Sequence, residues 1–318
     1  MHIGLEMNGV VVIDKRPGMT SHDVVLGVRK VAGVKKAGHT GTLDPLATGV
    51  LPVCIGEATK LVPFLVSVTK DYLVSMLLGV RTDTLDIEGE VLEEKEPQVT
   101  DQSVENALQG FLGRSEQIPP RYSAVKVQGR ALYKWARKGI IVDPPPRMVE
   151  ISHLTVEEIS LPYVTFRMSC SGGTYVRSLC ADVGDLLGCG ACVAGLRRTR
   201  SGIFSEAAAI VMDQKDRQGN DDRVRASLIP MAELLPDMRT IVPDDPWMKR
   251  IKVGVHPRAE MVNRRDDIPF LDSGDMVKLT GSHGELVAIA ELLYGSRELA
   301  GLQNDVPVMR LLRVFNEN

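Results

Sequence analysis

Cysteine is scarce in this chain, and its five copies form neither a disulfide framework nor a complete metal site. Cys189 and Cys192 make one C-x-x-C pair, but no second pair or nearby histidine completes the four ligands of a zinc site. The six histidines are scattered and show no H-E-x-x-H spacing. We therefore expect buried structural cysteines in a reducing compartment and no bound metal.

Long apolar runs are absent as well. No uninterrupted run approaches the roughly 18 residues that a membrane-spanning helix needs. Residues 1–12 lack the basic region and long apolar stretch of a signal peptide. With 44% hydrophobic and 25% charged residues, the composition is typical of a soluble globular protein. We expect a cytoplasmic protein that does not bind membranes.

An overall basic excess is also missing, because the net charge is −3. The charges are nevertheless separated: residues 114–147 carry a local net charge of +6 and residues 81–105 one of −7. Since binding to a polyanion depends on the local field, the basic segment is a candidate nucleic-acid surface, although a charged stretch can also be a solvated face. Tyr122, Tyr133 and Trp135 lie among its bases, as a surface that stacks nucleotides requires. The basic residues are Arg114, Arg121, Lys126, Arg130, Lys134, Arg137, Lys138 and Arg147.

Strand and helix patterns alternate without the regular spacing of βαβ units, which favours a mixed α+β fold. Strands are expected at 9–13, 51–55, 72–78, 149–159, 164–170, 195–200, 276–279, 287–292 and 308–315. Helices are expected at 20–32, 58–65, 100–113, 174–187, 229–235 and 246–253. The acidic stretch 81–97 is expected to form exposed strand and turn.

The 318 residues suggest two domains. Three prolines between Pro236 and Pro246 indicate a linker, so we expect one domain at 1–235 and a small one at 236–318. The polar residues 213–225 are expected to form an exposed insertion.

The most informative segment is residues 38–49, Gly-His-Thr-Gly-Thr-Leu-Asp-Pro-Leu-Ala-Thr-Gly. It is too polar and too rich in glycine for a core element, and such segments usually serve backbone geometry or a ligand. Its only carboxylate, Asp44, precedes Pro45, which disfavours the α region and holds the acid at the end of a loop. Asp44 could instead be the N-cap of one helical turn that ends before Gly49.

A second segment, residues 169–179, places Arg177 near the start of a helix. If Thr174 is the N-cap, Arg177 lies at position N3, where a cation opposes the helix macrodipole by roughly 0.3–1 kcal/mol. An ion pair between the guanidinium and a carboxylate would offset this cost. A bidentate pair with Asp44 would be such an ion pair.

Residues 38–52 resemble the catalytic motif of the TruB-type tRNA pseudouridine synthases. The segments 15–21, 70–72, 169–179 and 195–200 match further motifs of this family in order, so the resemblance covers residues 8 to about 235. The basic segment, about 114–147, falls in the insertion with which bacterial members grip RNA. The C-terminal segment is similar, more weakly, to the PUA-type RNA-binding domain.

The resemblance implies a pseudouridine synthase fold, with a mixed, mainly antiparallel sheet flanked by helices and a small PUA-like β domain. It also implies isomerisation of uridine to pseudouridine at position 55 in the T loop of tRNA. Asp44 would be the nucleophile, Arg177 its ionic partner, and Tyr72 the ring that stacks on the flipped-out base. His39 would take the place that this base leaves.

Further contacts follow from the same resemblance. Tyr175 and Leu196 would be pocket walls, and Lys15 would contact phosphate or the motif loops. Residues in the insertion would bind RNA, namely Lys126, Arg130, Lys134, Arg137 and Lys138. Because the reaction oxidises and hydrolyses nothing, no cofactor is expected, and neither is an obligatory protein partner.

Two other functions stay open at this point. A dyskerin-like subunit would act on RNA selected by a guide RNA and would need protein partners, although such relatives lack the insertion. An RNA-binding or tRNA-folding protein with incidental catalysis would use the same basic segment.

Overall fold

The computed structural model describes residues 7–66, 68–213, 216–262, 270–299 and 301–316. Its largest element is a mixed sheet in the order β14 (Ala209–Ile210), β1 (Gly9–Lys15), β3 (Thr48–Ile55), β12 (Ala191–Ser201), β4 (Lys70–Leu78), β11 (Tyr163–Cys170), β10 (Arg147–Ser160) and β7 (Gly113–Gln117). Three short strands pair with members of this sheet: β2 (Ala37–His39) with β3, β13 (Phe204–Ser205) with β12, and β15 (Ile229–Pro230) with β1. Within this sheet the pairs β1–β14 and β12–β3 are parallel and the other described pairs are antiparallel, which confirms the predicted α+β class.

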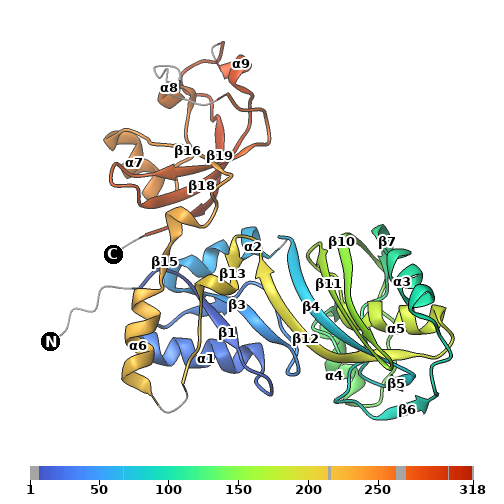
Figure 1. Cartoon of the computed structure of the whole chain (residues 1–318). Helices are drawn as coiled ribbons and strands as arrows, with labels where there is room; N and C mark the ends of the chain where they lie inside the picture. The colour runs from blue at the N-terminus through green and yellow to red at the C-terminus, as the bar shows by residue number, and fades with distance from the viewer. Residues whose placement is uncertain (1–6, 67, 214–215, 263–269, 300, 317–318) are drawn as a thin grey trace.

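Short helices surround this sheet and the smaller C-terminal one (Figure 1). The α-helices in the described residues are α1 (Ser21–Ala32), α2 (Val62–Leu65), α3 (Asp101–Gln109), α4 (Leu132–Ala136), α5 (Val176–Leu186), α6 (Arg217–Ala226), α7 (Asp245–Lys252), α8 (Ala259–Val262) and α9 (Ser296–Leu299). The 3₁₀ helices are η1 (Gly56–Leu61), η2 (Glu206–Ala208) and η3 (Met231–Glu233). A capping box between Thr20 and Asp23 starts α1, and Gly33 in the left-handed region ends it.

Alternation along β1 and β3 sends neighbouring side chains to opposite faces of the large sheet. On one face, Val11 and Ile13 pack in a buried cluster with residues of α1, α3 and α5. On the other face, Val10 and Val12 pack in a second buried cluster that includes residues of the C-terminal sheet. Helices therefore cover one face, and C-terminal strands help to cover the other.

The C-terminal sheet runs β16 (Arg239–Ile241), β17 (Met276–Thr280), β18 (Leu286–Leu292) and β19 (Met309–Val314). It has its own buried cluster around Trp247 and Val277. Polar contacts also tie it to the larger part of the chain: Lys278 Nζ donates to the Ala232 carbonyl at 3.0 Å, and Lys60 Nζ donates to the Val314 carbonyl at 2.8 Å. We propose that this division follows the predicted boundary after residue 235.

Several predicted elements need correction. The predicted helix at 229–235 is wrong, because β15 and η3 occupy it. The predicted linker between Pro236 and Pro246 is too long, because β16 and the start of α7 lie within it. The segment expected at 58–65 is split between η1 and α2, and the helix expected at 100–113 already ends at Gln109.

The segment 213–225 is not an exposed insertion, although residues 214–215 lie outside the described residues. It contributes most of α6, which packs against α1 and buries Val224 completely. The Asp216 side chain caps the helix by accepting from the Gly219 amide. The buried Asn220 side chain also accepts from the Asp213 amide, so a cap, a buried amide and one buried apolar residue attach this mostly polar helix.

A hairpin-like excursion leaves the large sheet where β7 ends and β10 begins. Gln117 pairs with Arg147 across these strands, so the excursion comprises residues 118–146, slightly less than the predicted 114–147. It contains β8 (Lys126–Val127), β9 (Arg130–Ala131) and α4. The acidic stretch beside it forms the two-stranded sheet of β5 (Val80–Thr82) and β6 (Val91–Glu94), as predicted.

The shared cluster makes a prediction about stability. Phe315 is 1% exposed and packs in the cluster that joins the two sheets, so Phe315→Ala should reduce the free energy of unfolding by about 3–5 kcal/mol. Phe270→Ala is the matched control, because that ring is 55% exposed. Denaturant unfolding of both variants checks this, and equal losses would contradict the shared core.

Candidate active site

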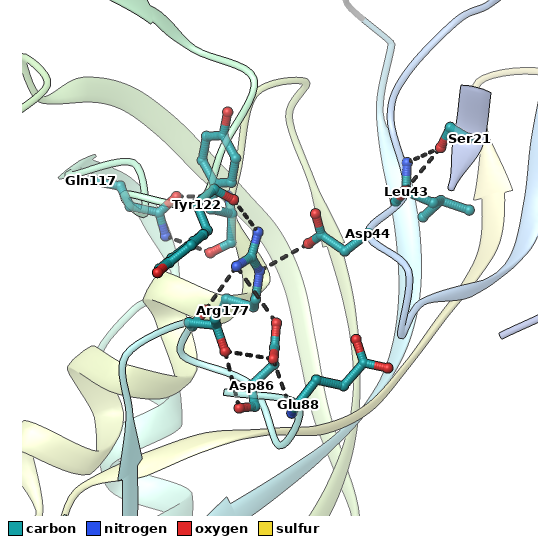
Figure 2. Close-up of polar contacts among 10 residues, drawn as sticks. Ser21, Leu43, Asp44, Asp86, Glu88, Gln117, Tyr122 and Arg177 are labelled. Atoms are coloured by element: carbon teal, nitrogen blue, oxygen red, sulfur yellow. Dashed lines mark hydrogen bonds and ion pairs between the residues drawn. The ribbon is translucent and has the colours of Figure 1, made fainter. Parts of the chain in front are cut away.

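The loop around Asp44 is fixed by bonds to its backbone. The Ser21 hydroxyl donates to the Leu43 carbonyl at 2.9 Å and accepts from the Leu43 amide at 2.8 Å (Figure 2). The Ala47 amide donates to the Asp44 carbonyl, which forms a single turn, and β3 begins directly afterwards at Thr48. In the described chain no helix lies between β2 and β3, and the Asp44 carboxylate pairs with Arg177, so the alternative of a helical turn capped by Asp44 is wrong.

Lys15 also fixes this loop. Its ammonium group is buried and donates to the carbonyls of Pro45 at 3.1 Å, Ala47 at 2.6 Å and Arg16 at 3.0 Å. Burial lowers the pKa of Lys15 to about 8, against the opposing effect of the nearby Asp44 charge. Lys15 is expected to contact either phosphate or the motif loops, and these bonds are contacts with the loop around Asp44.

Arg177 meets Asp44 across the site. The Nε atom lies 2.9 Å from Asp44 Oδ2, and the guanidinium is 4% exposed whereas the carboxylate is 32% exposed. The N–H does not point at the oxygen closely enough for a hydrogen bond, so the contact is an ion pair. The predicted bidentate pair is wrong, because both terminal nitrogens have other partners: NH1 donates to the Thr84 carbonyl at 2.7 Å and NH2 to the Tyr122 carbonyl at 2.9 Å.

The position of Arg177 in its helix also differs slightly from the prediction. Tyr175, not Thr174, is the N-cap of α5, so Arg177 lies at N2. The Thr174 hydroxyl instead donates to the Ser171 carbonyl. Arg177 still lies in the first turn, where its charge opposes the macrodipole and its carboxylate neighbours compensate.

A second carboxylate, Asp86, lies 3.6 Å from NH1 of Arg177 and is buried (Figure 2). Its Oδ1 atom accepts from the Thr84 hydroxyl at 2.7 Å and the Glu88 amide at 3.2 Å. Leu85, between Thr84 and Asp86, has φ 63°, an unfavourable value for a non-glycine residue. A strained turn thus brings a carbonyl and a carboxylate to the same guanidinium.

A pocket opens beside the ion pair. Its lining includes Tyr175 and Leu196, the two expected walls, and Tyr72, the ring expected to stack on the base, together with Asp44 and Arg177. Tyr72 lies on the buried face of β4, and burial raises its pKa. Burial also raises the pKa of Tyr175. The pocket therefore combines aromatic surface with one ionic pair, as a planar polar ring would require.

Sequence reasoning missed two cationic residues of this lining. Lys70 donates to the carbonyls of Val66 and Val68, and the buried Arg198 donates to those of Val50 and Gly41. Both lie in the family-like segments 70–72 and 195–200. The sequence there shows that these residues are basic, but it does not show that they line the pocket.

Gly49 explains how β3 and β12 approach so closely here. Its φ is 94°, and a Cβ atom at this position would lie 2.2 Å from the Arg198 carbonyl oxygen. Only glycine fits both conditions.

His39 lies outside the pocket lining. It ends β2, opposite Val53 of β3, and its Nδ1 atom accepts from the Gly41 amide at 3.3 Å. Burial lowers the pKa of His39, which favours the neutral ring. His39 thus lies near the loop that carries Asp44, but its side chain does not line the pocket.

The predicted RNA contacts lie together on the excursion. Lys126, Lys134, Arg137 and Lys138 are exposed, whereas Arg130 is half-buried. Arg130 lies 4.9 Å from the ring centre of Trp135, and Arg137 lies 5.4 Å from that of Tyr133. One face of each ring is therefore covered by a cation from the excursion itself.

The cysteines and the candidate metal ligands can be placed as well. All five cysteines are buried and free, Cys189 and Cys192 included. Within the described ranges, no group of three or more His, Cys, Asp or Glu residues is arranged to bind a metal ion. No helix in the described part of the chain is long and apolar enough to cross a membrane.

Comparison with known proteins identifies the family. Residues 29–176 match the model of the TruB family pseudouridylate synthase N-terminal domain, and residues 177–236 match that of the tRNA pseudouridylate synthase B C-terminal domain. The tRNA pseudouridine synthase B of Syntrophus aciditrophicus (strain SB) is 49% identical over 312 residues, which cover 98% of this chain and 99% of that protein. This chain belongs to the TruB family.

Other TruB-family relatives agree. The tRNA pseudouridine synthase B of Geobacter sulfurreducens (strain ATCC 51573 / DSM 12127 / PCA) is 41% identical and covers 98% of this chain and 100% of its own length. Among solved structures, a chain of a Cbf5-Nop10-Gar1 complex matches with a TM-score of 0.72 and 27% identity, covering 98% of this chain and 86% of its own. As a TruB-family member, the chain is a pseudouridine synthase, an isomerase.

The pKa of Lys15 predicts how stability changes with pH. The unfolded chain keeps this proton up to about pH 10.5, whereas the folded chain releases it from about pH 8. Lys15 therefore makes the free energy of unfolding rise with pH between these values, and Lys15→Met removes the rise. Urea unfolding across this range checks the prediction: the wild-type value minus the Lys15→Met value should increase with pH, and a flat difference would show that the pKa is not lowered.

Proposed function

We propose that this chain converts uridine to pseudouridine at position 55 in the T loop of tRNA. The observation that carries the proposal is the contact of Asp44 with Arg177 at 2.9 Å beside a pocket lined by Tyr72. The relatives that cover nearly the whole chain are named tRNA pseudouridine synthase B, which favours tRNA as the substrate.

In the proposed reaction, Asp44 is the nucleophile. An oxygen of Asp44 bonds to C1′ of ribose as the bond between C1′ and N1 of uracil breaks. The base turns over, and the bond from Asp44 to C1′ breaks when C5 bonds to the same C1′. C5 loses a proton and N1 gains one, so the overall change is an isomerisation without a redox step. A carboxylate oxygen of Asp44 supplies the electron pair for this attack, and the guanidinium of Arg177 lies 2.9 Å from that carboxylate.

The base must leave the RNA stack to reach Asp44. We assign Tyr72 to stacking on the flipped base, and Tyr175 and Leu196 to the walls that keep the detached uracil in place. His39 takes the position that the base leaves. Lys15 acts through the loop backbone: it fixes the carbonyls on both sides of Leu46 and thereby the direction of Asp44.

The excursion is assigned to RNA binding. Its exposed cations surround Tyr133 and Trp135, which supplies both phosphate contacts and aromatic surface for bases. We also assign the C-terminal sheet to RNA binding as a PUA-like domain. We further propose that the enzyme acts in the cytoplasm, with tRNA as its partner and without another protein.

A guide-dependent function, as expected for a dyskerin-like subunit, is the alternative. The relatives named tRNA pseudouridine synthase B are up to 49% identical, whereas the Cbf5 chain is 27% identical, which favours the tRNA-specific function. The purified chain should form carbodiimide-detected pseudouridine in a T stem-loop alone. A need for added guide RNA or protein would favour the alternative.

Asp44→Asn should abolish isomerisation, because the amide retains the shape of the side chain but cannot act as the nucleophile. Binding of tRNA should stay within a few-fold of wild type, as filter binding can measure. Asp71→Asn is the matched control, since Asp71 pairs with Arg200 and lies outside the pocket lining. Appreciable turnover by Asp44→Asn would show that another group attacks the nucleoside.

Changing Lys134, Arg137 and Lys138 together to alanine should weaken tRNA binding and flatten its salt dependence. The slope of log K against log salt is negative, and losing three phosphate contacts should reduce its magnitude by roughly 2–3 units. A variant in which Arg29, Lys30 and Lys35 become alanine removes the same charge from exposed positions on and after α1. If both variants change the slope equally, net charge rather than the excursion determines binding.

A further inference from the structure

Gln117 lies where the excursion meets the active site. It is the last residue of β7 and pairs with Arg147, the first residue of β10, so the excursion begins directly after it. Its side chain is 6% exposed, although a primary amide is normally solvated. A buried amide needs partners for both its donor and its acceptor groups.

Both partners of this amide belong to Tyr175. The Tyr175 backbone N–H donates to Oε1 of Gln117 at 2.7 Å, and Nε2 donates to the Tyr175 carbonyl at 3.0 Å (Figure 2). Tyr175 is the N-cap of α5, and within the described structure its own side chain makes no capping bond. A residue 58 positions earlier therefore fixes the start of this helix.

The same helix turn makes two more bonds to the excursion. The Ser178 hydroxyl donates to the Ile118 carbonyl at 2.9 Å, and Arg177 NH2 donates to the Tyr122 carbonyl at 2.9 Å. Residues 117, 118 and 122 of β7 and the excursion are thus hydrogen-bonded to residues 175, 178 and 177 at the start of α5. Arg177 follows Tyr175 by two residues, so a shift of the Tyr175 backbone moves the guanidinium relative to Asp44.

We propose that Gln117 is a positioning residue for the reaction: it sets the start of α5 so that Arg177 meets Asp44 and Tyr175 lines the pocket. This inference rests on the proposed roles of those residues. It also gives the excursion a second task. RNA held by the excursion reaches a site whose ionic pair is fixed by the base of that same excursion.

The first experiment compares three variants on a T stem-loop. Gln117→Leu removes both bonds to Tyr175 and should lower kcat by up to about a hundredfold, while KM and RNA affinity stay within about threefold. Gln117→Glu keeps an acceptor for the Tyr175 amide and should retain more activity than Gln117→Leu. Gln109→Leu is the control, because it removes one side-chain bond, to the Leu154 carbonyl on β10, and should leave kcat unchanged.

A double-mutant cycle separates positioning from general destabilisation. If Gln117 acts through Arg177, then Gln117→Leu should cost little further kcat once Arg177 is replaced by lysine. Additive losses would overturn the proposal. So would a rise in KM without a fall in kcat, or an equal loss of kcat in Gln109→Leu.

Failure of the proposed function would look different. If the wild-type chain does not modify the T loop but modifies another tRNA uridine, the same variants are compared on that uridine. The positioning role of Gln117 is then supported if Gln117→Leu lowers kcat at the new site and the double-mutant cycle is non-additive. It is refuted if neither effect is seen.

Discussion

A buried guanidinium needs partners for its charge, and Arg177 finds them in three separate parts of the chain. It contacts Asp44 in the loop before β3, Asp86 and the Thr84 carbonyl in the turn after β5, and the Tyr122 carbonyl in the excursion. Because an unpaired buried charge is very costly, these segments are required to meet at one place. The candidate active site is the point at which they meet.

Local rules of sequence explain much of the scaffold around this point. The strands expected at 9–13, 51–55, 149–159 and 164–170 and the helix expected at 20–32 are all read from short-range patterns. The structure has β1, β3, β10, β11 and α1 at these places. The glycine-rich segment with Asp44 is equally local. Its composition indicates a loop that presents an acid, and the structure shows that acid on a fixed turn.

The rest depends on contacts between residues far apart in the chain. Ser21, Asp86 and Gln117 act by bonding to backbone or charge elsewhere, and no spacing within the sequence marks such pairs. Asp86 even lies in a stretch whose acidic composition indicates exposure. Similarly, α6 looks like a polar loop until the burial of Val224 against the rest of the fold is known.

The central claim is that the arginine at the start of α5 pairs with the carboxylate of Asp44 and holds it in the direction that the reaction needs. The most direct test is the single-turnover rate of pseudouridine formation by Arg177→Lys with saturating T stem-loop. A lysine ammonium cannot contact Asp44 and still satisfy the Thr84 and Tyr122 carbonyls, so the rate should fall by about a hundredfold or more with RNA affinity nearly unchanged. A rate close to wild type would contradict the account.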